Sequence, residues 1–120
     1  MKQIDALSLD QLDPDSDGYP SEQTLAWLEH CDLLTESLND FLAVLSANWH
    51  WGLKRKDWKD GTIKLYLATG GWSGNESVIR ALSCNGLFWS LCWDRSVRGG
   101  GYWFTITPAL QRMWKYDSAL

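Results

Sequence analysis

The segment TGGWSGNES, at residues 69–77, contains the residue types and spacing that best fit a chemical role. Its glycines lead into a helix start, and the first turn of a helix has unpaired N–H groups that attract anions. Arginines further along the chain offer positive charge to the same ligand. We therefore predict a binding surface around this turn and the last hairpin. Its candidate residues are Gly70, Gly71, Trp72, Ser73, Gly74, Asn75, Arg80, Arg95, Arg98 and Tyr102.

The same segment also has a purely structural interpretation, which we favour. Ser73 and Glu76 fit a capping box, in which the serine hydroxyl and the glutamate carboxylate pair with backbone N–H groups. Glycines before a helix commonly supply backbone angles that other residues avoid. The segment lacks the lysine of a phosphate-binding P-loop and the spacing of a dinucleotide-binding motif. The sequence thus predicts the helix start more firmly than it predicts a ligand.

Other patterns that could do chemistry are incomplete. The segment DPDSDG, at residues 13–18, matches the first half of a calcium loop, but Thr24 stands where a bidentate glutamate belongs. The only histidines are His30 and His50, and the three cysteines form no C-x-x-C motif. Glu76 is the best candidate acid or base, and capping already explains it. We therefore expect a protein that is not an enzyme and that uses no metal or cofactor.

Charge is divided unevenly along a chain whose net charge is −4. Residues 1–40 carry ten acidic residues and one lysine, whereas residues 41–120 carry ten basic and five acidic residues. The basic half mixes cations with aromatic rings in KRK at 54–56 and RGGGYW at 98–103, a combination found in single-strand binders. Each run also fits a solvated loop. The overall acidity argues against tight, sequence-blind binding to nucleic acid.

The chain contains nine tryptophans in 120 residues. A domain of this size cannot easily bury them all, and tryptophan is enriched at the energetic centres of protein interfaces. No apolar run approaches the roughly 20 residues that span a bilayer. The acidic start also lacks the order of a signal peptide. We expect a cytoplasmic protein with a protein partner and no membrane association.

Hydrophobic periodicity predicts the elements that would position these residues. Residues 1–20 are expected to be an irregular acidic lead-in, and residues 21–120 a single α+β domain. Helices are predicted over 22–31, 36–47 and 74–84, with a short one from 108, and strands over 49–57, 62–69, 87–93 and 102–107. We expect Asn85 and Gly86 to end the third helix and 94–101 to be a loop. The order ααββαββα indicates a four-stranded, mainly antiparallel sheet with a helix packed on one face.

The string LATGGWSGNESVIRALSCNGLFWSLCWDRSVRGGGYWFTI, which starts at Leu67, resembles a family of small proteins encoded by tailed phages and prophages. The matching features are TGGWSGNE, the asparagine after a short helix, a strand rich in tryptophan and phenylalanine, and an R-GG loop before an aromatic strand. The upstream segments DGYPSEQTL and NWHWG are also similar. The likeness covers about residues 17–106 and leaves out the tail.

This resemblance implies a phage or prophage origin, and it brings no established activity with it. Small non-structural phage proteins often bind and inhibit host machinery. We therefore expect an accessory protein that binds and inhibits a host protein in the host cytoplasm, most concretely a counter-defence inhibitor of the anti-CRISPR or anti-restriction type. The alternative is a small module that binds an anion, a nucleotide or nucleic acid at the glycine turn. A homodimer is left open.

Overall fold

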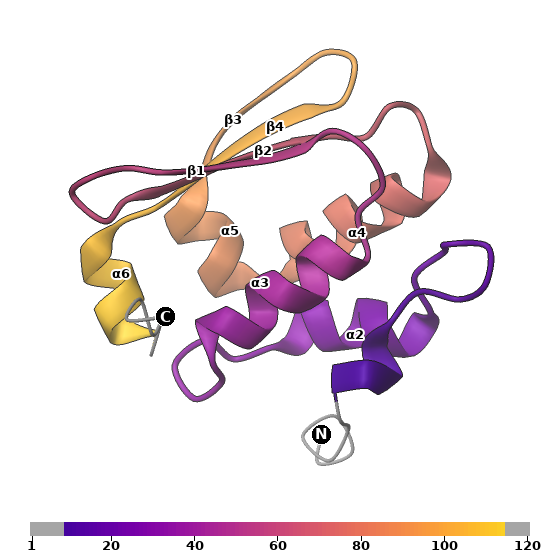
Figure 1. Cartoon of the computed structure of the whole chain (residues 1–120), viewed down its shortest axis with the longest axis horizontal. Coiled ribbons are helices and arrows are strands. Elements are labelled where there is room, and N and C mark those ends of the chain that lie inside the picture. The colour runs from indigo at the N-terminus through magenta and orange to yellow at the C-terminus, as the bar shows by residue number, and fades with distance from the viewer. Residues whose placement is uncertain (1–8, 115–120) are drawn as a thin grey trace.

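The computed structural model describes residues 9–114 and confirms the α+β class (Figure 1). The elements are the 3-10 helix η1 (Leu9–Leu12), α2 (Glu22–His30), α3 (Leu38–Ala47), β1 (Leu53–Asp57), β2 (Ile63–Ala68), α4 (Ser73–Cys84), α5 (Gly86–Cys92), β3 (Trp93–Val97), β4 (Gly101–Ile106) and α6 (Pro108–Met113). Leaving η1 aside, their order is ααββααββα. It differs from the predicted order by the additional helix α5, and strand β3 occupies the first half of the segment predicted as a loop over 94–101.

The four strands form one antiparallel sheet in the spatial order β1-β2-β4-β3. In Figure 1, α2, α3, α4 and α5 all lie on the same side of this sheet. The predicted antiparallel sheet is therefore confirmed, and several helices, rather than the one predicted, pack on one face of it. The strand predicted over 49–57 begins only at Leu53, because Trp51 and Gly52 have positive φ angles that interrupt extended backbone.

The core lies between the sheet and the helices. In β2, buried Ile63, Leu65 and Leu67 alternate with more exposed residues, which is the pattern of a strand with one covered face. A chain of aromatic contacts runs from the helices to the sheet, with ring centroids 5.0 Å apart between Phe41 and Phe88 and 5.2 Å apart between Phe88 and Phe104. Burial of these side chains is the main force that holds the helices on the sheet.

Helix α5 replaces the strand predicted over 87–93, and Asn85 explains the difference. Asn85 does not end α4 in a left-handed conformation, since its φ is −85°. Its side-chain oxygen instead accepts a hydrogen bond from the N–H of Phe88 and caps α5. Its amide nitrogen donates to the carbonyls of Leu28 at 2.8 Å and Cys31 at 3.0 Å, near the end of α2. One buried side chain thus ends one helix and begins another.

Both ends of the described chain pack into the domain. The carbonyl of Leu12, in the predicted lead-in, accepts hydrogen bonds from the buried side chains of Thr24 and Asn48. Trp114, at the end of α6, is fully buried, and its carbonyl accepts a hydrogen bond from the N–H of Leu38. The second helix is capped by Ser37 and begins at Leu38, so the predicted start at residue 36 is corrected.

Candidate functional site: an aromatic surface at the start of α4

The glycine turn before α4 has a backbone conformation that glycine adopts readily and other residues avoid. Gly70 and Gly71 have φ angles of 62° and 76°, in the left-handed region. The N–H of Trp72 closes the turn on the carbonyl of Thr69. Helix α4 already begins at Ser73, so Trp72 is the N-cap and makes no side-chain capping bond. The predicted capping box is therefore wrong, because Ser73 lies one position too late to cap the helix.

The indole ring of Trp72 packs against Gly74. A Cβ placed on Gly74 would lie 2.2 Å from an atom of this ring, which is closer than any real contact. The ring therefore folds back over the first turn of α4. The segment GWSG is thus explained by packing, since the second glycine leaves the space that the tryptophan occupies.

Asn75 fixes the start of α4 to the chain segment before β1. It is fully buried, and its side-chain oxygen accepts a hydrogen bond of 3.0 Å from the N–H of His50. Its amide nitrogen donates to the carbonyl of His50 at 2.6 Å and to the carbonyl of Thr69 at 3.3 Å. The side-chain amide thus pairs with the backbone of His50 as a neighbouring strand would. This pairing holds two segments that are distant in the sequence next to each other.

Four rings meet at this point, and we call them the aromatic surface: Tyr19, His50, Trp51 and Trp72. The Trp72 centroid lies 4.6 Å from that of Tyr19, 4.8 Å from that of His50 and 6.2 Å from that of Trp51. These separations lie within or near the range of favourable aromatic pairs. Trp72 is partly covered by its neighbours, whereas Trp51 and Tyr19 are 73% and 41% exposed.

The acidic segment DPDSDG brings Tyr19 to this surface. One carboxylate oxygen of Asp15 accepts hydrogen bonds of 2.9 Å from the N–H groups of Asp17 and Tyr19. Gly18 has a φ of 87°, and a Cβ on it would lie 2.6 Å from Nε2 of His50. The turn therefore packs directly against the imidazole. Exposed carboxylates therefore lie beside the aromatic surface.

Trp51 is the most exposed member of the surface and has the least favourable backbone. In the described part of the chain, Trp51 is the only non-glycine residue with a positive φ angle, which is 55°. A bulky residue in this conformation stores of order 1–3 kcal/mol of strain. Gly52 follows with a φ of 67°, and a Cβ there would lie 2.9 Å from the carbonyl of Ala68. The fold thus holds a large apolar side chain in water at a cost in stability.

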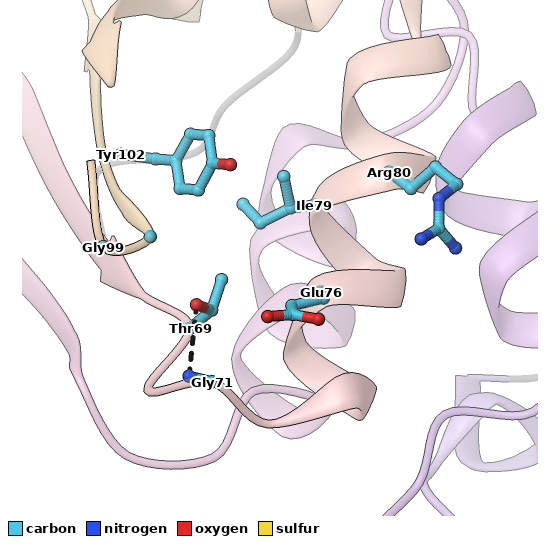
Figure 2. Close-up of a pocket in the computed structure, with 8 residues that line it drawn as sticks. Thr69, Gly71, Glu76, Ile79, Arg80, Gly99 and Tyr102 are labelled. Atoms are coloured by element: carbon cyan, nitrogen blue, oxygen red, sulfur yellow. Dashed lines mark hydrogen bonds between the residues drawn. The ribbon is translucent and has the colours of Figure 1, made fainter. Parts of the chain in front are cut away.

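A separate pocket of about 620 Å³ lies between the start of α4 and the β3–β4 turn, and Figure 2 shows its lining. The carboxylate of Glu76 lies near Thr69 and Gly71, on the side of α4 that faces Tyr102. The guanidinium of Arg80 points to the other side of the helix. An anion in this pocket would meet a carboxylate first, which makes the predicted anionic ligand unfavourable there.

The structure divides the sequence-predicted site residues between separate places. Gly71, Arg80 and Tyr102 line the pocket, although the Arg80 charge is directed away from it. Trp72 belongs to the aromatic surface, and Gly74 and Asn75 support it. Gly70 lies in the turn before α4, and Ser73 is the first residue of α4. Arg98 is exposed in the β3–β4 turn. Arg95 lies in β3, with its guanidinium carbon 4.0 Å from the ring centroid of Trp103, on the sheet.

Sequence reasoning did not select Tyr19, His50 and Trp51 as site residues. The segments that carry them, DGYPSEQTL and NWHWG, stand out in the sequence beside TGGWSGNE but were not joined to it. Three segments that are far apart in the chain thus form one surface.

Comparisons with protein families, curated proteins and solved structures found no match to this chain. Within residues 9–114, no three or more His, Cys, Asp or Glu residues are grouped where they could hold a metal ion. In the same part of the chain, no helix has both the length and the apolar character needed to cross a membrane.

Proposed function

We propose that this chain is a phage- or prophage-encoded accessory protein that binds and inhibits a host protein through its aromatic surface. The observation that carries the proposal is the exposure of Trp51, which is 73% accessible and held at a φ of 55°. Strain and apolar exposure both reduce stability, and such features cluster where a protein makes contact with something else. Tryptophan and tyrosine are the residues that most often dominate the binding energy of an interface.

The charge beside the aromatic surface indicates the chemistry of the partner. Asp13, Asp15 and Asp17 are exposed next to Tyr19, so the surface combines rings with carboxylates. A partner rich in arginine and lysine would pair with the carboxylates and place cations over the rings. Host proteins that bind nucleic acid have such basic surfaces. Covering one of them would block its access to nucleic acid, which fits a counter-defence role in the host cytoplasm.

The aromatic surface is held rigidly, so a partner would bind to a site that is already formed. The hydrogen bonds of Asn75 and Asp15 fix the backbone on both sides of the rings, so little order must be gained when the partner arrives. None of the four rings is among the residues that line the pocket of Figure 2, where Glu76 lies.

The test is capture of a partner from host lysate by the tagged chain, followed by affinity measurement with that purified partner. Trp51→Ala and Tyr19→Ala should each weaken binding by roughly 30-fold or more, as expected for the centre of an interface. Met113→Ala is the matched control, because Met113 is 49% exposed on α6, outside the aromatic surface. Binding that tolerates both aromatic substitutions would exclude this surface as the contact.

A second measurement tests the charge of the partner. Asp13→Lys combined with Asp17→Lys should slow association and reduce its dependence on salt, because the steering field beside the rings changes sign. Glu29→Lys combined with Asp32→Lys changes charge equally near the end of α2 and should have a smaller effect. Equal effects of the two pairs would show that only the net charge of the chain matters.

A further inference from the structure

The outer face of the sheet, opposite the helices, carries a second group of side chains. Directly opposed residues of neighbouring strands share a face, and the register places Lys54, Tyr66, Trp103 and Arg95 in one row across β1, β2, β4 and β3. The next row holds Lys56, Lys64 and Thr105. We call this group the basic sheet face. The helices in Figure 1 pack on the other side, so none of them covers it.

In the first row of the basic sheet face, two rings lie between two cations. The ring centroids of Tyr66 and Trp103 are 4.5 Å apart, and the guanidinium of Arg95 covers the Trp103 ring from the next strand. The Nζ of Lys56 lies 5.3 Å from the ring centroid of Trp58, which follows β1 and is 49% exposed. A groove of about 190 Å³ lies over the same residues, lined by Lys54, Arg55, Lys56, Lys64, Leu65, Tyr66 and Trp103.

The charge of this face is positive although the chain as a whole is acidic. Lys54, Lys56, Lys64 and Arg95 contribute four positive charges. The carboxylate of Asp94 lies at the edge, where it accepts a hydrogen bond from Thr105 and lies 4.0 Å from the Nζ of Lys64. Ten of the acidic residues lie in residues 1–40, before the first strand in the chain. The net charge of −4 therefore does not describe the potential at this face.

We infer that the basic sheet face binds single-stranded nucleic acid. Cations on three of the four strands, β1, β2 and β3, match the phosphates of an extended strand, and the flat rings of Tyr66 and Trp103 offer stacking surfaces to unpaired bases. Bases paired in a duplex cannot reach such rings, so the rings distinguish single strands from duplexes. An acidic protein partner would use the cations but would leave the row of rings without a matching group.

This surface is distinct from the aromatic surface of the proposed function and has the opposite charge on its flank. The two surfaces can thus act independently, one toward a basic protein and the other toward a polyanion.

The experiment measures fluorescence anisotropy of a labelled oligothymidine of about 15 nucleotides, a length that fills one site of this kind. The same measurement uses a duplex of equal length. Binding should favour the single strand, and the logarithm of affinity should fall with the logarithm of salt concentration with a slope of about −2 to −3, as expected for three or four phosphate contacts. No binding at low salt, or a duplex bound equally well, would overturn the inference.

Substitutions locate the site. Lys54→Glu and Lys56→Glu, both at exposed positions, should each weaken binding and make the salt slope shallower by about one contact. Trp103→Ala should weaken binding by roughly tenfold or more through lost stacking. Arg112→Glu changes charge by the same amount on α6 and should leave the affinity within about twofold.

Circular dichroism shows whether each variant folds. If Trp103→Ala does not fold, the two lysine variants decide whether the basic sheet face binds the oligonucleotide. Binding that survives both lysine substitutions, or that Arg112→Glu reduces as strongly, would exclude the basic sheet face. Capture of an acidic host protein that competes with the oligonucleotide and binds more tightly would also overturn the assignment, because the face would then be a protein interface.

Discussion

Asn75 pairs with the backbone of His50 through both ends of its side-chain amide, at 3.0 Å and 2.6 Å. The two residues are 25 positions apart in the sequence. Because this pairing joins the first turn of α4 to the segment before β1, it sets the distance between Trp72 and Trp51. The aromatic surface is therefore a consequence of one buried polar side chain and not only of contact between the rings.

Replacing Asn75 should destabilise the fold more than its size suggests. Asn75→Ala leaves the N–H and the carbonyl of His50 without the partner they have now. Buried backbone groups that lose a partner cost about 1–3 kcal/mol each, so we expect a loss of about 2–4 kcal/mol in the free energy of unfolding by urea. Gln23→Ala, at an exposed position of α2, should change it by less than about 0.5 kcal/mol.

Gly74 and Gly86 both lie in the first turn of a helix, and they should respond to alanine in opposite ways. Gly74→Ala drives a methyl group into the Trp72 ring, so we expect a loss of about 1–3 kcal/mol and a change in tryptophan emission. Nothing lies within 4 Å of a Cβ on Gly86, and its φ is not positive. Gly86→Ala should be neutral or stabilise the chain by up to about 1 kcal/mol. Equal losses in the two variants would show that the Trp72 ring is not the cause of the loss at Gly74.

Asn85 should be more important for stability than an ordinary helix cap. Asn85→Ala removes the cap of α5 together with two hydrogen bonds to the carbonyls of Leu28 and Cys31. We expect a loss of about 3 kcal/mol from these combined contacts. Ser37→Ala removes only the cap of α3 and should cost about 1 kcal/mol. Thermal unfolding of the two variants compares them directly, and similar melting temperatures would contradict the double role of Asn85.

Burial raises the pKa of the Cys92 thiol to about 12, with a smaller contribution from the nearby charge of Asp94. Below the ordinary value of 9.0, the thiol is protonated in both the folded and the unfolded chain, so it has no effect on the pH dependence there. Above it, the unfolded thiol loses its proton first, and stability falls by up to about 1.4 kcal/mol per pH unit until the folded thiol also ionises. Stability should therefore decline between about pH 9 and pH 12.

The measurement is the free energy of unfolding across this alkaline range for the wild type and for Cys92→Ala. The variant is less stable at neutral pH but should show a shallower decline, since the other titrating groups are unchanged. Thiol labelling gives an independent check, because exposed Cys84 should react in the folded chain while buried Cys92 reacts only on unfolding. Parallel declines in the two chains would rule out Cys92 as the source.

Much of the fold was predictable because its signals are local. The alternation of Ile63, Leu65 and Leu67 indicates a strand at any place in a chain. Pro108 after Thr107 likewise marks a helix start, and Thr107 caps α6. The strand prediction over 87–93 was wrong because a short, almost wholly apolar run has no period that separates a strand from a helix. The choice was made by Asn85, whose partners belong to α2.

The sequence by itself determined the strand and helix periods, the glycine turn at residues 70–71 and the division of charge along the chain. Each of these depends on residue type and on neighbours within a few positions. Only the tertiary structure decided that Tyr19, His50 and Trp51 join Trp72, and that Lys54, Tyr66, Trp103 and Arg95 form one row. Both arrangements depend on contacts between residues far apart in the chain, because strand register and buried hydrogen bonds are settled by the packing of the whole domain.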